Sequence, residues 1–80
     1  MKLYLISQTQ NDDYDTYDSA VVAALDEEAA RQIDPGSTKS RWGDAYSSWC
    51  KSPEYVQVKY IGEAADGIDQ GVVCASFNAG

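Results

Sequence analysis

The chain has 80 residues, with thirteen acidic side chains, six basic ones, no histidine and a formal net charge of -7. A chain of this length is expected to form a single domain, residues 1–80, that buries only roughly 60% of its unfolded surface, which argues against a deep catalytic cleft. The charge argues against a nucleic-acid-binding protein, because such proteins neutralise phosphates with lysine and arginine, and it favours a basic partner.

Two strands are predicted in the first third of the chain. Residues 2–7, KLYLIS, alternate apolar side chains to both faces and are typical of a strand that is covered at least partly on both sides. Residues 18–24, DSAVVAA, form a second apolar run after a long acidic connection. We expect the two runs to pair as an antiparallel hairpin.

Residues 25–33, LDEEAARQI, are predicted to form a helix of about two turns. Asp26 is a suitable N-cap, the two glutamates that follow it favour the positive end of the helix dipole, and Pro35-Gly36 supply the stop. A helix this short is not stable alone, so it must pack on a sheet. The residues expected to face the sheet are Leu25, Ala29, Ala30 and Ile33.

The second half of the chain is predicted to contain two further strands. Residues 36–52 carry Trp42, Tyr46 and Trp49, too much aromatic area for a free linker, and are expected to fold over the sheet edge. Side chains that alternate between two faces predict a strand at residues 55–62. A glycine-containing connection and a last strand at residues 72–77 follow. The element order β-β-α-β-β predicts an α+β fold, a four-stranded antiparallel sheet with one short helix packed on a face.

The cysteines and the hydropathy pattern indicate the cellular compartment in which the protein is expected. The N-terminus, MKLYLISQ, lacks the apolar segment and cleavage site of a signal peptide, so a cytoplasmic, reduced protein is expected. Cys74 lies in an apolar run and is expected in the core, whereas Cys50 lies in a polar segment and is the candidate for exposure. Two cysteines without histidine make no zinc site, and no apolar stretch approaches the roughly 20 residues that cross a bilayer.

The acidic segment NDDYDTYD, residues 11–18, is the most unusual part of the sequence. The alternate spacing of Asp13 and Asp15 suits a calcium loop, but Tyr17 stands where a third ligand is needed, no glycine provides the turn, and Ala24 replaces the closing glutamate. The chain has no histidine for general acid-base catalysis, and for the same reason a cysteine nucleophile would have no imidazole base. No phosphate-binding glycine motif is present. We therefore expect no metal, no cofactor and no enzymatic activity.

Recognition of another protein is the remaining hypothesis. Residues 1–30 hold seven acids against one base, Lys2, so the acidic segment could imitate the phosphates of a nucleic acid in a lysine- and arginine-lined groove. The alternative is that the charge only keeps the protein soluble and that the tyrosines pack back on the sheet, which is favoured for Tyr17 and open for Tyr14. The predicted contact residues are Asp12, Asp13, Tyr14, Asp15, Asp18, Glu27 and Glu28.

Two other clusters offer alternative binding surfaces. Residues 39–51 mix basic and aromatic side chains, a pattern found in single-strand nucleic-acid binders, but on a chain of this charge they are expected to cover the core. Glu63, Asp66 and Asp69 form a second acidic stretch, which is usually a solvated connection.

Several segments resemble a family of very short proteins carried by phages and other mobile elements, which includes an inhibitor of type I-C CRISPR-Cas systems. These segments are KLYLISQ, YDTYDSAVVAA, EEAARQIDPG, VKYIGEA and GVVCASFNAG. The resemblance implies an anti-CRISPR protein that binds Cas protein(s) of the type I-C Cascade in the cytoplasm of the bacterial host. It implies that binding covers a basic DNA-binding surface and blocks target DNA binding, without direct contact to nucleic acid.

The alternative function is a small phage structural or regulatory interaction protein that binds a host factor unrelated to CRISPR. The oligomeric state stays open between monomer and homodimer, since a four-stranded sheet leaves two edges.

Overall fold

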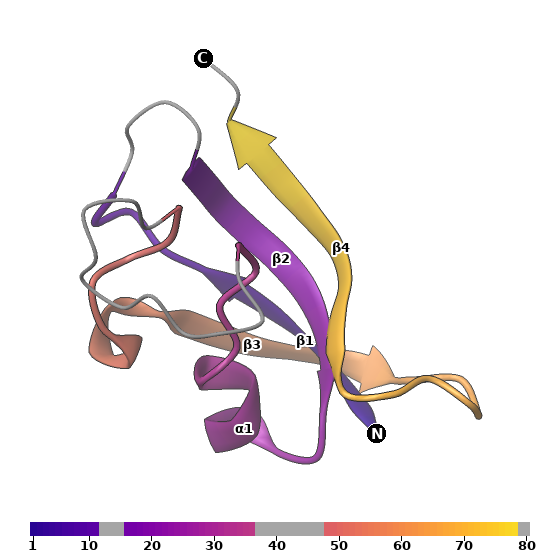
Figure 1. The fold of residues 1–80 in the computed structure, drawn as a ribbon. Helices are drawn as coiled ribbons and strands as arrows, with labels where there is room; N and C mark the ends of the chain where they lie inside the picture. Colours follow the sequence, from indigo (N-terminus) through magenta and orange to yellow (C-terminus); the bar gives the residue numbers. More distant parts are fainter. Residues whose placement is uncertain (12–15, 37–47, 79–80) are drawn as a thin grey trace.

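The computed structural model describes residues 1–11, 16–36 and 48–78 (Figure 1). The sheet has the order β3-β1-β2-β4, and every neighbouring pair of strands is antiparallel. The predicted α+β fold, with a four-stranded antiparallel sheet and one short helix, is confirmed. The elements are β1 (Lys2–Ser7), β2 (Thr16–Ala24), α1 (Glu27–Arg31), the 3-10 turn η1 (Pro53–Tyr55), β3 (Gln57–Glu63) and β4 (Gly71–Asn78).

The central hairpin of β1 and β2 is the predicted one, with Leu5 opposite Val21 and Ile6 opposite Ala20. The strands β3 and β4 follow each other in the chain but lie at opposite edges of the sheet, next to β1 and β2 respectively. The connection between them, residues 64–70, therefore leads from one edge of the sheet to the other. Because β2 and β3 are both antiparallel to β1, both strands end at the same end of the sheet, where Lys2 pairs with both Ala24 and Glu63.

The helix begins where the sequence predicts and ends sooner. The Asp26 side chain accepts a hydrogen bond of 2.8 Å from the Ala29 backbone N–H, which is the expected N-cap. The C-cap is Gln32, so α1 has five residues and the prediction of two turns is wrong. The Arg31 guanidinium donates a hydrogen bond to the Val56 carbonyl and thereby ties the helix to the residue before β3.

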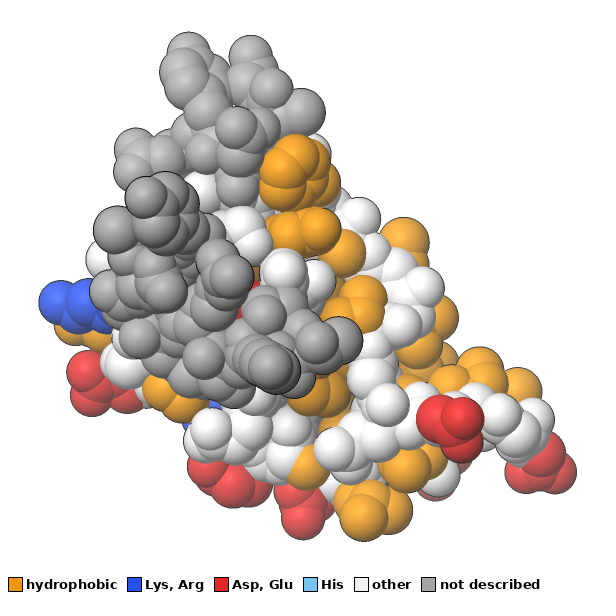
Figure 2. Space-filling view, in the orientation of Figure 1, with side chains coloured by type: hydrophobic (Ala, Val, Ile, Leu, Met, Phe, Trp, Pro, Cys, Tyr) orange, Lys and Arg blue, Asp and Glu red, His pale blue; other side chains and the backbone are white. Residues whose placement is uncertain are grey.

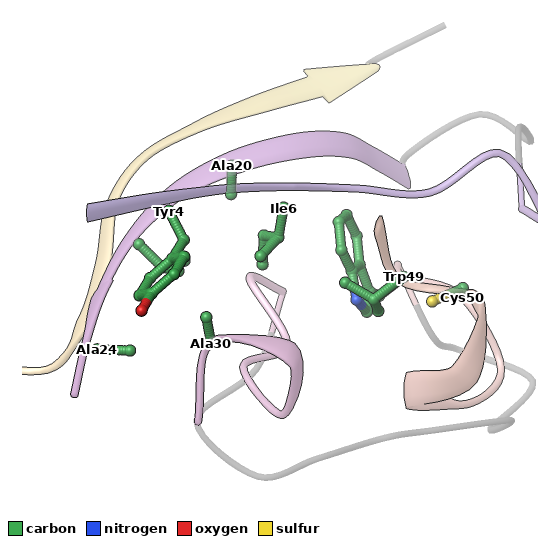
Figure 3. Close-up of a cluster of buried hydrophobic side chains, with 9 residues drawn as sticks. Tyr4, Ile6, Ala20, Ala24, Ala30, Trp49 and Cys50 are labelled. Carbon is green, nitrogen blue, oxygen red and sulfur yellow. The ribbon is translucent and has the colours of Figure 1, made fainter. Parts of the chain in front are cut away.

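The core lies between the sheet and the layer that contains α1, which contacts β1, β2 and β3 (Figure 1). Because Ala30 is the one buried residue of α1, the helix cannot fill this layer by itself. Trp49, which is 1% exposed, fills the space beside Ile6, as Figure 3 shows. The buried hydrophobic cluster consists of Tyr4, Ile6, Ala20, Val22, Ala24, Ala30, Trp49, Cys50 and Val56.

The predicted helix face is wrong at Leu25, and Tyr60 of β3 is only partly covered. Ala29 and Ile33 pack against the core as expected, but Leu25 is 66% exposed, because it precedes the N-cap and lies outside the helix. Tyr60 is on the core-facing side of β3, with its ring edge-on to Tyr4 at 5.8 Å, yet 53% of it stays exposed. An edge strand leaves its side chains covered from one side only, which explains this exposure.

The predicted burial of the two cysteines is wrong in both cases. Cys50 is fully buried and its Sγ lies 3.4 Å from the Ser52 carbonyl, because it follows Trp49 into the core. Cys74 is exposed. It pairs with Val21 across β2 and β4, so its side chain lies on the sheet face away from Ile6 and α1, on an edge strand.

Replacing isoleucine by valine at two positions tests this core assignment. Ile6 is fully buried and Ile61 is 46% exposed. We expect Ile6→Val to lower the free energy of unfolding by about 1 kcal/mol, because it removes one buried methylene, and Ile61→Val to change it by less than about 0.5 kcal/mol. Urea denaturation measures both, and equal losses would contradict the assignment.

Candidate functional site

The acidic segment predicted as the binding surface is described only at its two ends. Asp12, Asp13, Tyr14 and Asp15 lie outside the described residues. The two ends are joined by Gln8, which is 3% exposed and whose Nε2 donates hydrogen bonds of 2.8 Å to the carbonyls of both Asn11 and Tyr17. Its Oε1 accepts from the Asn11 backbone N–H at 2.8 Å. A single buried amide therefore fixes the start and the end of the segment relative to each other.

A second set of hydrogen bonds ties the same two ends to residues 48–51. The Tyr17 N–H donates to the Ser48 carbonyl at 2.7 Å, and Asn11 Nδ2 donates to the Trp49 carbonyl at 3.0 Å. The Lys51 N–H donates to the Gln10 side-chain oxygen at 2.9 Å. Because the Trp49 side chain is in the core, the base of the acidic segment is anchored to the core as well.

Tyr17 and Asp18, at the end of the acidic segment, are placed differently. Tyr17 packs against the core, with its ring 4.8 Å from that of Phe77, which confirms the interpretation that this tyrosine packs back on the sheet. Asp18 is exposed at a register shift of β2 between Tyr17 and Ser19. Its backbone carbonyl accepts from the Gln8 N–H at 3.1 Å, while its carboxylate has the Ser19 hydroxyl within 3.4 Å and faces water.

The two predicted glutamates lie on α1, beyond the other end of β2. Glu27 pairs with Arg31 at 3.2 Å, and Glu28 accepts from the Gln32 side-chain amide at 3.3 Å; both glutamates are exposed. Ala24, the last residue of β2, lies six positions after Asp18, and a rise of roughly 3.3 Å per residue makes this distance about 20 Å. The structure therefore divides the described contact residues into two groups.

The sheet order adds further acids to the helix side. From the sequence, the acidic stretch at residues 63–69 is expected to be a solvated connection. The strands β2 and β3 end at the same end of the sheet, so this connection and the start of α1 lie at that end together. Figure 2 shows acidic side chains over α1 and over the β3–β4 connection. No local sequence signal could have found this grouping, because it depends on which strands are neighbours. We call this surface the acidic end: Asp26, Glu27, Glu28, Glu63, Asp66 and Asp69.

Other kinds of site find little support in the described part of the chain. Among these residues no group of three histidine, cysteine or acidic side chains is placed to hold a metal ion. None of the helices described there is long and apolar enough to cross a membrane. An open depression of about 270 Å³ on β1 and β3 has one ionisable residue in its lining, Lys59, which gives it no acid-base pair.

The two thiols differ in their chemistry. Burial raises the pKa of Cys50 to about 11, against an opposing effect of the backbone N–H groups of Cys50 and Ser52, and nearby Asp34 adds to the rise. A thiol with this pKa stays protonated at neutral pH and is a poor nucleophile. Cys74 is open to solvent on β4.

Comparisons with known proteins give no relative: no family model matches the chain, no curated protein is significantly similar to it, and no solved structure matches it. The described residues thus define a small acidic α+β protein with two exposed groups of carboxylates.

Thiol labelling tests the reversed cysteine assignment. At low micromolar protein and neutral pH, Ellman's reagent should modify Cys74 within minutes and Cys50 only after unfolding, because the reagent needs an accessible thiolate. Cys74→Ser should abolish the fast phase. Two fast thiols in the native wild-type protein would contradict the burial of Cys50.

The raised pKa of Cys50 also predicts a dependence of stability on pH. From about pH 9 to about pH 11 the unfolded chain loses the thiol proton and the native chain keeps it, so the free energy of unfolding falls as pH rises. The stabilisation by the protonated, buried thiol is fully present below pH 9 and is lost by about pH 11. The loss in the free energy of unfolding is on the order of 2 kcal/mol. Urea denaturation of the wild type and of Cys50→Ala at pH 8, 9, 10 and 11 measures this loss, since the other titrating groups are common to both proteins. An equal dependence of the free energy of unfolding on pH in the two proteins would contradict the prediction.

Proposed function

We propose that this chain is a non-enzymatic inhibitor that binds Cas protein(s) of the type I-C Cascade on a basic DNA-binding surface and blocks target DNA binding. The class of partner follows from charge, and the particular complex from the family resemblance. The observation that carries the proposal is the presence of exposed carboxylates near both ends of β2, on a chain with a net charge of -7. Such a surface is complementary to a groove lined by lysine and arginine.

The spacing of the two acidic groups supports imitation of a nucleic acid. Asp18 lies about 20 Å from Ala24 along β2, and the α1 glutamates follow shortly after Ala24. Duplex DNA carries one charge per about 1.7 Å of axis, so this distance corresponds to roughly six base pairs. Both groups therefore fit one basic channel of the kind in which a crRNA-guided complex holds its nucleic acids.

The anchored base of the acidic segment supports the same proposal. Association requires ordering of interface loops, and a loop whose ends are already fixed pays less of this entropic cost. Gln8 and Asn11 fix the ends through the hydrogen bonds described above. They position the binding residues and are not proposed to touch the partner.

Separate roles follow for the contact residues. The four aspartates Asp12, Asp13, Asp15 and Asp18 are proposed as the main contacts, with Tyr14 as an aromatic anchor of the kind that dominates interface energies. Glu27 and Glu28 support them from α1. Glu27 is exposed in its ion pair with Arg31, and Arg31 keeps its hydrogen bond to the Val56 carbonyl, so exchanging Arg31 for a partner's cation costs little.

A second candidate function is a small phage structural or regulatory interaction protein that binds an unrelated host factor. The same exposed charge favours it equally, because a basic surface is not unique to Cas proteins. A pull-down from a type I-C host lysate with the tagged chain separates the two, since only the lead proposal predicts Cas proteins in the eluate.

Charge-neutralising variants test the proposed contacts. In a binding assay with purified type I-C Cascade and labelled target duplex, we expect replacement of the four aspartates by asparagine to weaken inhibition by at least about 100-fold. Glu27→Gln with Glu28→Gln should weaken it by about tenfold. The matched control combines Glu54→Gln, Glu63→Gln, Asp66→Asn and Asp69→Asn, which removes the same charge elsewhere and should retain inhibition.

The control distinguishes three outcomes. Equal losses in the control and in the aspartate variant would mean that total charge, not the acidic segment, drives binding. Loss in the control alone would move the main contacts from the acidic segment to the acidic end. Full inhibition by both variants, or an affinity independent of salt, would reject the acidic mechanism, because exposed charge pairs are screened beyond about 8 Å at physiological ionic strength.

A further inference from the structure

The strand β4 forms an uncharged edge of the sheet. It pairs with β2 on one side only, and none of its eight residues is charged. Val72, Val73 and Phe77 are 43%, 49% and 47% exposed, and Figure 2 shows hydrophobic side chains along this side of the molecule. The opposite edge strand, β3, carries a lysine and a glutamate. Charged residues protect an edge from pairing with another chain, and β4 lacks this protection.

The C-terminal part of β4 has the regular geometry that strand pairing requires. The register with β2 shifts at Val73, which has no partner, because Val72 pairs with Val22 and Cys74 pairs with Val21. Such a bulge discourages pairing at its own position. From Cys74 to Asn78 the β4 residues find partners on β2 one after another, and the next extra residue lies on β2. On their other side these five residues pair with no strand among the described residues, so within that part of the chain they offer an uninterrupted edge.

We propose that a second copy of the chain pairs with this edge, β4 antiparallel to β4, across a two-fold axis at Ser76. The two sheets then form one continuous sheet of eight strands. In this register Ala75 lies opposite Phe77 of the second copy, so that a large half-exposed ring meets a small side chain twice in one symmetric contact. The ring is already held by Tyr17 at 4.8 Å, which reduces the entropy lost on pairing.

The distribution of charge favours a second copy in this orientation. Two chains of net charge -7 repel each other, so they can approach only where the charge is absent. The acidic β3–β4 connection ends six residues before Ser76, and antiparallel pairing therefore keeps the two connections about 40 Å apart. A parallel arrangement would place them side by side.

On β2 and β4, the charged residue nearest the proposed axis is Asp18. Its two copies are three strand spacings apart, at least about 14 Å, which exceeds the screening length of about 8 Å at physiological ionic strength. The repulsion at the contact itself is therefore small. Pairing over five residues buries less area than a standard interface of roughly 1,600 Å², so we expect a micromolar dimer.

Sedimentation equilibrium of the intact chain tests the proposal. From about 1 to about 500 μM, the mass should rise from the 8.7 kDa of the monomer toward twice that value. Ser76→Lys should weaken dimerisation by at least about fivefold, because two lysines then face each other at the axis. Gln57→Lys makes the same charge change on the exposed β3 edge and should leave dimerisation within about twofold of the wild type.

Each other result overturns the proposal. A constant mass of 8.7 kDa would leave β4 to a strand of another protein or to no partner, and equal effects of the two lysine variants would place the contact elsewhere. Hydrogen exchange gives a test without substitutions: amide protection from Cys74 to Asn78 should rise with protein concentration, while that of β3 stays constant. Concentration-independent exchange in β4 would contradict strand pairing. Neither measurement depends on the proposed Cascade target.

Discussion

The packing of the Trp49 side chain against the sheet is the contact on which the rest of the structure depends. The helix contributes one buried alanine, so the indole supplies much of the apolar layer opposite β1 and β2 (Figure 3). Burying an aromatic side chain of 150–250 Å² stabilises a fold by on the order of 5 kcal/mol. Small domains have total stabilities of about 5–15 kcal/mol, so one side chain carries a large share. This explains how a helix of five residues can suffice as the second layer.

The same contact positions the acidic segment. The backbone around Trp49 accepts hydrogen bonds from Tyr17 and from the Asn11 side chain, at the two ends of that segment. Gln8, the residue directly after β1, joins these two ends through its side-chain amide. Core packing and presentation of the acidic residues are therefore coupled, and a change that loosens the indole will also loosen the base of the proposed binding surface.

The strands, the central hairpin and the helix start could be predicted because each depends on local alternation or on a capping residue. The exposure of Cys74 could not, since an apolar run such as β4 is buried in the middle of a sheet and exposed at its edge. The burial of Cys50 could not either, since it depends on the packing of the neighbouring Trp49 against the sheet. Leu25 fits a helical apolar stripe but lies before the cap. Gln8 and Asn11 are ordinary polar residues in the sequence, and only their position between β1 and Trp49 gives them a role.

Charge and backbone pairing occupy different parts of this molecule, and salt should affect them in opposite ways. Binding to a basic partner gains from attraction between unlike charges, so added salt weakens it. Pairing of two β4 strands works against the repulsion of two chains of net charge -7, so added salt strengthens it. The proposed axis at Ser76 lies seven positions after Asp69, the last residue of the acidic end, so the carboxylates there stay accessible when the edge is occupied. The fold thus permits a dimer that still presents one acidic surface on each of its two copies.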